Sequence, residues 1–141
     1  MCGNTPLRKF VSCFYGDLDV SNRTLTFTNA GHNPPFLMRS NGECIRLDEG
    51  GCVIGAFGES SFAQGRIRFD EGDKLLLFTD GVTEARNADG EEFGEERVQE
   101  CLRSYRGRNA AELRTIILNE VKEFCDDNFD DDAALMVVIA D

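Results

Sequence analysis

The sequence has 141 residues, which is enough for one domain with a real hydrophobic core. A net charge of -11 argues against a nucleic-acid partner, because no basic surplus is available to neutralise phosphates. No apolar run is long enough to span a bilayer, and the N-terminus lacks the basic-then-apolar pattern of a signal peptide. We therefore expect a cytoplasmic globular protein with no membrane or nucleic-acid partner.

The first half of the chain predicts a meander of antiparallel strands. The first two strands form a hairpin, because turn residues 19–22 separate them. Pro34 and Pro35 then end the second strand, since proline cannot pair within a ladder. Asn41-Gly42 is a strong hairpin signal, and the glycine-rich residues 49–61 are irregular. The expected strands lie at residues 10–18, 23–29, 36–39, 44–47 and 62–69.

Residues 74–79 form a short, almost purely apolar run between turn residues, which predicts a strand buried on both faces. Asp80 follows this strand, and Gly81 lets the backbone turn sharply or approach a ligand closely. A buried strand that ends in Asp-Gly either presents a metal ligand or only makes a turn. The local sequence alone favours the turn.

The second half predicts a turn of helix at residues 82–86, two longer helices and a closing strand. Residues 95–105 carry apolar side chains at helical spacing. The next helix begins at Asn109, with Glu112 three residues later as in a capping box. Residues 134–140 are apolar throughout, which predicts a central strand. The chain is therefore expected to be α+β.

An acidic run, Asp130-Asp-Asp132, comes directly before the closing strand. If the two buried strands are antiparallel neighbours, Asp80 and one or two of Asp131 and Asp132 meet at one sheet edge. Carboxylates brought together in this way repel one another unless a hard cation neutralises them, and oxygen ligands indicate Mg²⁺ or Mn²⁺. The alternative is a solvated acidic loop.

Other common catalytic groups are scarce. His32 is the only histidine, so neither a Ser-His-Asp nor a Cys-His arrangement has a second base available. His32 lies in a Gly-His-Asn-Pro turn, where it either stiffens the loop through a hydrogen bond or lies near the site with Asn33. The six cysteines form no Cys-x-x-Cys pair, which favours reduced, mostly buried thiols.

Three motifs, in this order, resemble the PP2C-like (PPM) serine/threonine phosphatases of the bacterial SpoIIE and RsbU type. The motifs are Asn29-Ala-Gly-His-Asn-Pro-Pro35, Gly72-Asp-Lys-Leu-Leu-Leu-Phe-Thr-Asp-Gly-Val-Thr-Glu-Ala85 and Asp131-Asp-Ala-Ala-Leu135. The resemblance covers nearly the whole chain. It implies a PP2C-like antiparallel β-sandwich flanked by helices.

The resemblance also implies a function and its residues. The family hydrolyses phosphoserine or phosphothreonine in a regulatory protein, such as an anti-sigma-factor antagonist. Two Mn²⁺ or Mg²⁺ ions hold and activate the attacking water, with no further catalytic side chain. Asp80 and Asp131 match the metal-binding aspartates of the family, while Gly81 and Asp132 would support the metal site.

One departure from the family pattern affects activity. The first metal motif of the family, a Gly-Asp-Val-x-Gly-x-Gly-like segment, is absent. We therefore expect residues 1–141 to be a single phosphatase domain that is incomplete at its N-terminus and impaired in catalysis. The alternative is a non-catalytic interaction module that keeps the scaffold, with an exposed sheet edge that could pair with a second copy.

Overall fold

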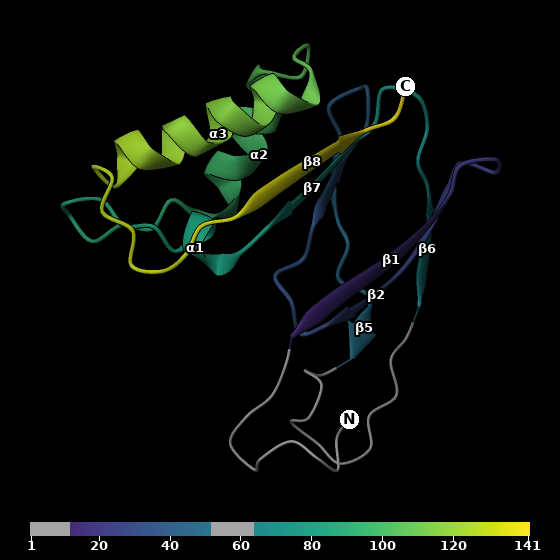
Figure 1. Cartoon of the computed structure of the whole chain (residues 1–141), viewed down its shortest axis with the longest axis horizontal. Coiled ribbons are helices and arrows are strands. Elements are labelled where there is room, and N and C mark those ends of the chain that lie inside the picture. Colours follow the sequence, from purple (N-terminus) through teal and green to yellow (C-terminus); the bar gives the residue numbers. More distant parts are fainter. Residues whose placement is uncertain (1–11, 52–63) are drawn as a thin grey trace. The chain divides into compact units, whose positions relative to one another are not determined.

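The computed structural model describes residues 12–51 and 64–141 (Figure 1). The chain divides into two compact units that alternate along the sequence. The first unit contains the described residues of Met1–Pro34 and Arg46–Asp70, and the second contains Pro35–Ile45 and Glu71–Asp141. Neither unit is continuous in sequence. The single-domain organisation stays a prediction.

The first unit is built on a sheet with β2 in its centre. β2 pairs antiparallel with β1 from Cys13↔Ala30 to Asp19↔Thr24, which confirms the predicted hairpin. On its other side it pairs antiparallel with β6 and, further along, parallel with β5. Leu25 and Phe27 are buried between half-buried threonines, as their alternation predicts. The strands are β1 (Cys13–Asp19), β2 (Thr24–Ala30), β5 (Gly50–Gly51) and β6 (Gly65–Arg68).

The second unit holds a four-stranded sheet in the order β4-β3-β7-β8. The strands are β3 (Phe36–Met38), β4 (Cys44–Arg46), β7 (Lys74–Phe78) and β8 (Leu135–Ile139). β7 is buried almost throughout, as predicted. It pairs antiparallel with β8 from Lys74↔Ile139 to Phe78↔Leu135. This is the arrangement under which Asp80 and Asp131 were expected to meet at one sheet edge.

The prediction that the closing strand is central is wrong for the sheet as described. β8 is its last strand, and Met136 is 60% exposed. The apolar character of β8 has another cause, because one face of the strand packs in the core beneath α3. Leu135 is part of that core, and Val137 packs against it. An apolar strand sequence indicates that the faces of the strand are covered. It does not indicate whether both edges of the strand are paired with neighbouring strands.

Three helices follow β7: α1 (Asp80–Thr83), α2 (Gly94–Ser104) and α3 (Ala110–Phe124). The predicted capping box of α3 is confirmed. The Glu112 N–H donates to Asn109 Oδ1 at 2.9 Å, and the Asn109 N–H donates to Glu112 Oε2 at 3.2 Å. Among the described helices, none combines the length and the apolar character needed to cross a membrane.

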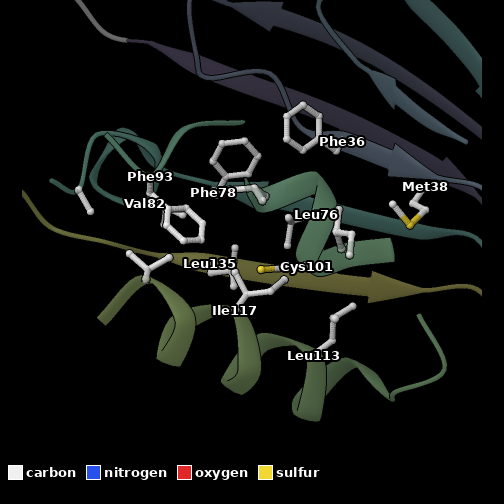
Figure 2. Close-up of a cluster of buried hydrophobic side chains, with 14 of the residues drawn as sticks. Phe36, Met38, Leu76, Phe78, Val82, Phe93, Cys101, Leu113, Ile117 and Leu135 are labelled. Atoms are coloured by element: carbon white, nitrogen blue, oxygen red, sulfur yellow. The ribbon is translucent and has the colours of Figure 1, made fainter. Parts of the chain in front are cut away.

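The core of the second unit lies between its sheet and its helices (Figure 2). Phe36 from β3 and Phe78 from β7 place their ring centroids 5.1 Å apart. Leu113 and Ile117 from α3 are fully buried in the same cluster. This packing holds α3 against β8, and it thereby fixes the end of β7 and the start of β8, where the candidate site lies.

Candidate functional site

The turn after β7 carries the first site aspartate. Thr79 has an extended backbone and caps the N-terminus of α1, which Asp80 opens. The Val82 N–H donates to the Thr79 carbonyl at 3.0 Å, and the Glu84 N–H donates to the Asp80 carbonyl at 2.8 Å. A buried strand and a short helix therefore position Asp80. Asp80 itself is exposed.

Thr79 joins this turn to the acidic loop before β8. Its Oγ1 donates to the Asp132 carbonyl at 3.0 Å and accepts the Ala134 N–H at 2.9 Å. The Thr79 N–H also donates to the Ala134 carbonyl at 3.1 Å. We call these three hydrogen bonds the Thr79 clamp. Together with the β7–β8 pairing, the clamp holds the segments that carry Asp80 and Asp131 at one end of the sheet.

Gly81 lies directly against the same loop. A Cβ at this position would lie 2.2 Å from the Asp132 carbonyl oxygen and 2.6 Å from its carbon. Gly81 is not among the glycines with positive φ, so the turn itself does not require glycine here. The requirement comes from the close approach of two backbone segments, because no other residue leaves enough room.

Asp131 faces a pocket beside this contact. Its Oδ1 accepts the N–H of Asp132 at 2.7 Å, which orients the carboxylate. The pocket has a volume of about 270 Å³ and is lined by Gly81, Glu84, Ala85, Arg86, Asp130 and Asp131. Three acidic residues and one arginine therefore surround a space large enough for small ligands and water.

The ligand chemistry of this region suits a hard cation, but the ligand set is partial. Carboxylate oxygens are the donors that Mg²⁺ and Mn²⁺ prefer. Within residues 12–51 and 64–141, however, no three His, Cys, Asp or Glu side chains are grouped in an arrangement that could hold a metal. The structure thus brings together the segments that carry Asp80 and Asp131, and the role of these two residues as metal ligands stays a prediction.

His32 and Asn33 lie in the first unit and make local contacts. The His32 N–H donates to Asn29 Oδ1 at 2.8 Å, and His32 Nδ1 lies 2.9 Å from the Asn33 carbonyl oxygen. These bonds stiffen the loop, which is one of the two roles expected for His32. Asn33 Nδ2 is buried without a hydrogen-bond partner. A role of these residues near the metal site stays a prediction.

Sequence reasoning missed Thr79, Glu84 and Arg86. In the sequence, Thr79 is only the last residue of a buried strand, where threonine is a common residue. Its function as a link depends on which loop lies opposite, and that loop is more than fifty residues away in sequence. Glu84 and Arg86 follow α1 and line the same pocket as Asp131. No local signal distinguishes them from other exposed charged residues.

Comparisons with known proteins identify the family. The family model of Stage II sporulation protein E (SpoIIE) matches residues 1–140. Protein IcfG of Synechocystis sp. (strain ATCC 27184 / PCC 6803 / Kazusa) is 40% identical over 93 residues, which cover 66% of this chain and 15% of that protein. Phosphoserine phosphatase RsbU of Bacillus subtilis (strain 168) is 27% identical over 137 residues, which cover 96% of this chain and 40% of that protein.

The fold agrees with that of solved phosphatase domains. The structure of the PP2C phosphatase domain of SpoIIE from Bacillus subtilis, solved with a fragment of its regulatory domain, matches with a TM-score of 0.78 and 18% identity. The match covers 91% of this chain and 38% of that one, so the chain spans only part of these relatives. The predicted α+β, PP2C-like fold is confirmed. The chain belongs to the SpoIIE family of PP2C-like phosphatases.

Proposed function

We propose that this chain is part of a cytoplasmic, metal-dependent protein phosphatase that acts on phosphoserine or phosphothreonine in a regulatory protein. One observation carries the proposal: the Thr79 clamp joins the Asp80 turn to the loop of Asp131 and Asp132 at distances of 2.9–3.1 Å. Two relatives, RsbU and RsbP of Bacillus subtilis, are named phosphoserine phosphatases, which supports the same reaction for the family of this chain.

Asp80 and Asp131 are the residues that would hold Mn²⁺ or Mg²⁺, with Gly81 and Asp132 as supporting residues. When bound, a pair of such ions supplies an activated water and neutralises charge on the phosphoryl group. The acidic residues Glu84, Asp130 and Asp131 that line the pocket support the proposed need for a cation. Three acidic residues repel a phosphate ester, and the single arginine that lines the pocket offsets only part of this repulsion.

The proposed activity of the isolated chain is low. The upstream Gly-Asp motif of the family is absent from the sequence, and the described residues do not group three metal-binding side chains. Two carboxylates alone bind a divalent ion weakly, because Mg²⁺ and Mn²⁺ sites usually draw on more ligands. The activity of a longer protein that contains this chain would depend on what supplies the remaining ligands.

Calorimetric titration with Mn²⁺, combined with hydrolysis of a phosphoserine peptide, tests the proposal. We expect weak Mn²⁺ binding and slow turnover by the chain, with binding reduced by about tenfold or more in Asp80→Asn and in Asp131→Asn. Asp89→Asn is the matched control, because Asp89 is an exposed aspartate that is not among the residues lining the pocket.

Two results would overturn parts of the proposal. Mn²⁺ binding that is unchanged in both Asp80→Asn and Asp131→Asn would exclude these residues as ligands. Fast Mn²⁺-dependent turnover by the chain, lost in Asp80→Asn, would keep the site but contradict the proposed impairment.

A non-catalytic interaction module is the second candidate, and one observation favours it. β8 is the last strand of the described sheet, and it exposes Met136. An unpaired edge is a template for pairing with another strand. In this function the chain would keep the phosphatase scaffold and use the β8 edge to bind a second copy of itself.

A further inference from the structure

We infer that the Thr79 hydroxyl is a positioning group that sets the separation between the Asp80 turn and the Asp131 loop, and thereby the affinity for the divalent ion. The inference rests on the proposed function, since it assumes that Asp80 and Asp131 share an ion. It adds a residue that binds neither the ion nor the substrate and acts through the backbone of the loop.

The hydroxyl of Thr79 acts both as a donor and as an acceptor towards one short segment. It donates to the Asp132 carbonyl at 3.0 Å and accepts the Ala134 N–H at 2.9 Å. The Asp132 carbonyl comes one residue after the proposed ligand Asp131. The third bond of the clamp uses the Thr79 N–H, which any residue except proline would supply. The side chain therefore contributes two of the three bonds.

These bonds hold the loop beyond the end of the sheet. The β7–β8 ladder stops at Phe78↔Leu135, so strand pairing does not extend to Asp132 or Asp131. Without the hydroxyl, the Asp132 carbonyl and the Ala134 N–H would lose these partners. The loop would then be free to move away from the turn and to pair with water instead.

Gly81 provides the opposing constraint. Its backbone lies so close to the Asp132 carbonyl that even a Cβ would be 2.2 Å from the oxygen, so the loop has little room to come nearer. The Thr79 hydroxyl prevents the loop from moving away. Gly81 limits how closely the loop approaches the turn, and the Thr79 hydroxyl limits how far the loop moves away. Together they set the distance between the Asp80 turn and the Asp131 loop.

Substitutions at position 79 separate the effect of the hydroxyl group from the effect of the side-chain shape. Thr79→Val keeps the shape of the side chain and its stiff β-branched rotamer but removes both hydroxyl bonds. Thr79→Ser keeps the hydroxyl and removes only the methyl group. Thr115→Val is the matched control, because the Thr115 hydroxyl on α3 donates to the Ala111 carbonyl at 3.0 Å, away from the clamp.

The test uses the whole chain and two measurements: amide hydrogen exchange of Ala134 by NMR and Mn²⁺ affinity by calorimetry. In Thr79→Val we expect Ala134 to exchange about tenfold faster relative to Leu76 in the core of β7, and Mn²⁺ to bind about tenfold more weakly. Thr79→Ser and Thr115→Val should stay within about threefold of the wild type in both measurements. The Leu76 reference separates a local change from general loss of stability, and Thr79→Ala replaces Thr79→Val if that variant does not fold.

The outcomes separate this inference from the proposed function. Wild-type binding of Mn²⁺ that depends on Asp80, with unchanged affinity in Thr79→Val, would overturn the positioning role and leave the proposed function standing. Equal loss of affinity in Thr79→Val and Thr79→Ser would also overturn it, because the hydroxyl would then not be the cause. A wild-type chain that binds Mn²⁺ equally well without Asp80 and Asp131 would overturn the proposed function itself.

Discussion

Gly81 is the residue whose replacement is most informative about the site. We expect Gly81→Ala to lower the free energy of unfolding by about 1–3 kcal/mol, because a new methyl group would overlap the Asp132 backbone, which cannot rotate away. Urea denaturation measures this loss. Gly107→Ala is the control, since a Cβ there meets no atom within 4 Å. Equal stability of the two variants would contradict the close approach.

Cys101 gives the stability of the chain a dependence on alkaline pH. Burial of the side chain, with smaller effects from Glu120 and Glu100, raises the pKa of this thiol from 9.0 to about 11. Well below pH 9 the thiol is protonated in both the folded and the unfolded chain. As the pH rises from 9 towards 11, the unfolded chain loses the proton while the folded chain keeps it, so the folded state is progressively destabilised.

We therefore expect the free energy of unfolding to fall more steeply between pH 8.5 and 11 in the wild type than in Cys101→Ala, by about 2 kcal/mol over the range. Denaturant titrations at a series of pH values measure both slopes, and the difference between the two proteins cancels the other groups that titrate. Parallel curves would show that the Cys101 thiol does not ionise differently in the folded and unfolded chains.

At the residue scale, the sequence offered candidate carboxylates but not the groups that hold their segments in place. Asp80 and Asp131 stand in recognisable motifs, so they could be singled out. The function of Thr79 and the reason for Gly81 depend on the backbone of Asp132, which reaches them only through long-range pairing. Side-chain type is visible in a sequence, whereas a close approach between distant segments is not.

At the scale of helices and strands, the sequence predicted the features that depend only on neighbouring residues in the chain. The capping box of α3 involves only Asn109 and Glu112, and the buried character of β7 follows from its own apolar run. The position of β8 in the sheet depends on which strands lie beside it, and an apolar strand at an edge has the same sequence pattern as a central one. This is why β8 was predicted to be central.

The edge position of β8 leads to a prediction about self-association. If the edge pairs with a second copy, the mass measured by light scattering should rise towards that of a dimer as concentration increases. Met136→Lys should keep the protein monomeric, because a charged side chain on an edge strand opposes pairing. Its thermal stability should change little, since Met136 is exposed.

Val20→Lys is the control for this experiment. Val20 is 78% exposed, like Met136 a large apolar side chain on the surface, but it lies in the turn after β1 in the first unit. The Val20→Lys substitution should therefore leave any association through β8 unchanged. A wild-type chain that stays monomeric at the highest concentrations would count against the interaction-module candidate.

At the scale of the whole molecule, the chain passes between its two compact units three times. Residues 46–70 of the first unit separate the β3–β4 hairpin from β7 in the second. The first passage falls between Pro34 and Pro35, which predicted only the end of a strand. No proline- or serine-rich linker marks the other two passages, at residues 45–46 and 70–71. The SpoIIE family model nevertheless spans both units, because it matches residues 1–140 as one stretch.

The Thr79 clamp has a consequence for the free energy of folding. The Thr79 hydroxyl and its partner Asp132 are 53 residues apart, and closing a flexible loop of that length costs about 3.5 kcal/mol in chain entropy. Three hydrogen bonds contribute about 3 kcal/mol, so they do not close the loop by themselves. The β7–β8 ladder and the packing of α3 against β8 supply the remaining free energy. The longer helices α2 and α3 supply no proposed metal ligand, yet the packing of α3 on β8 contributes to the closed loop on which the ion site depends.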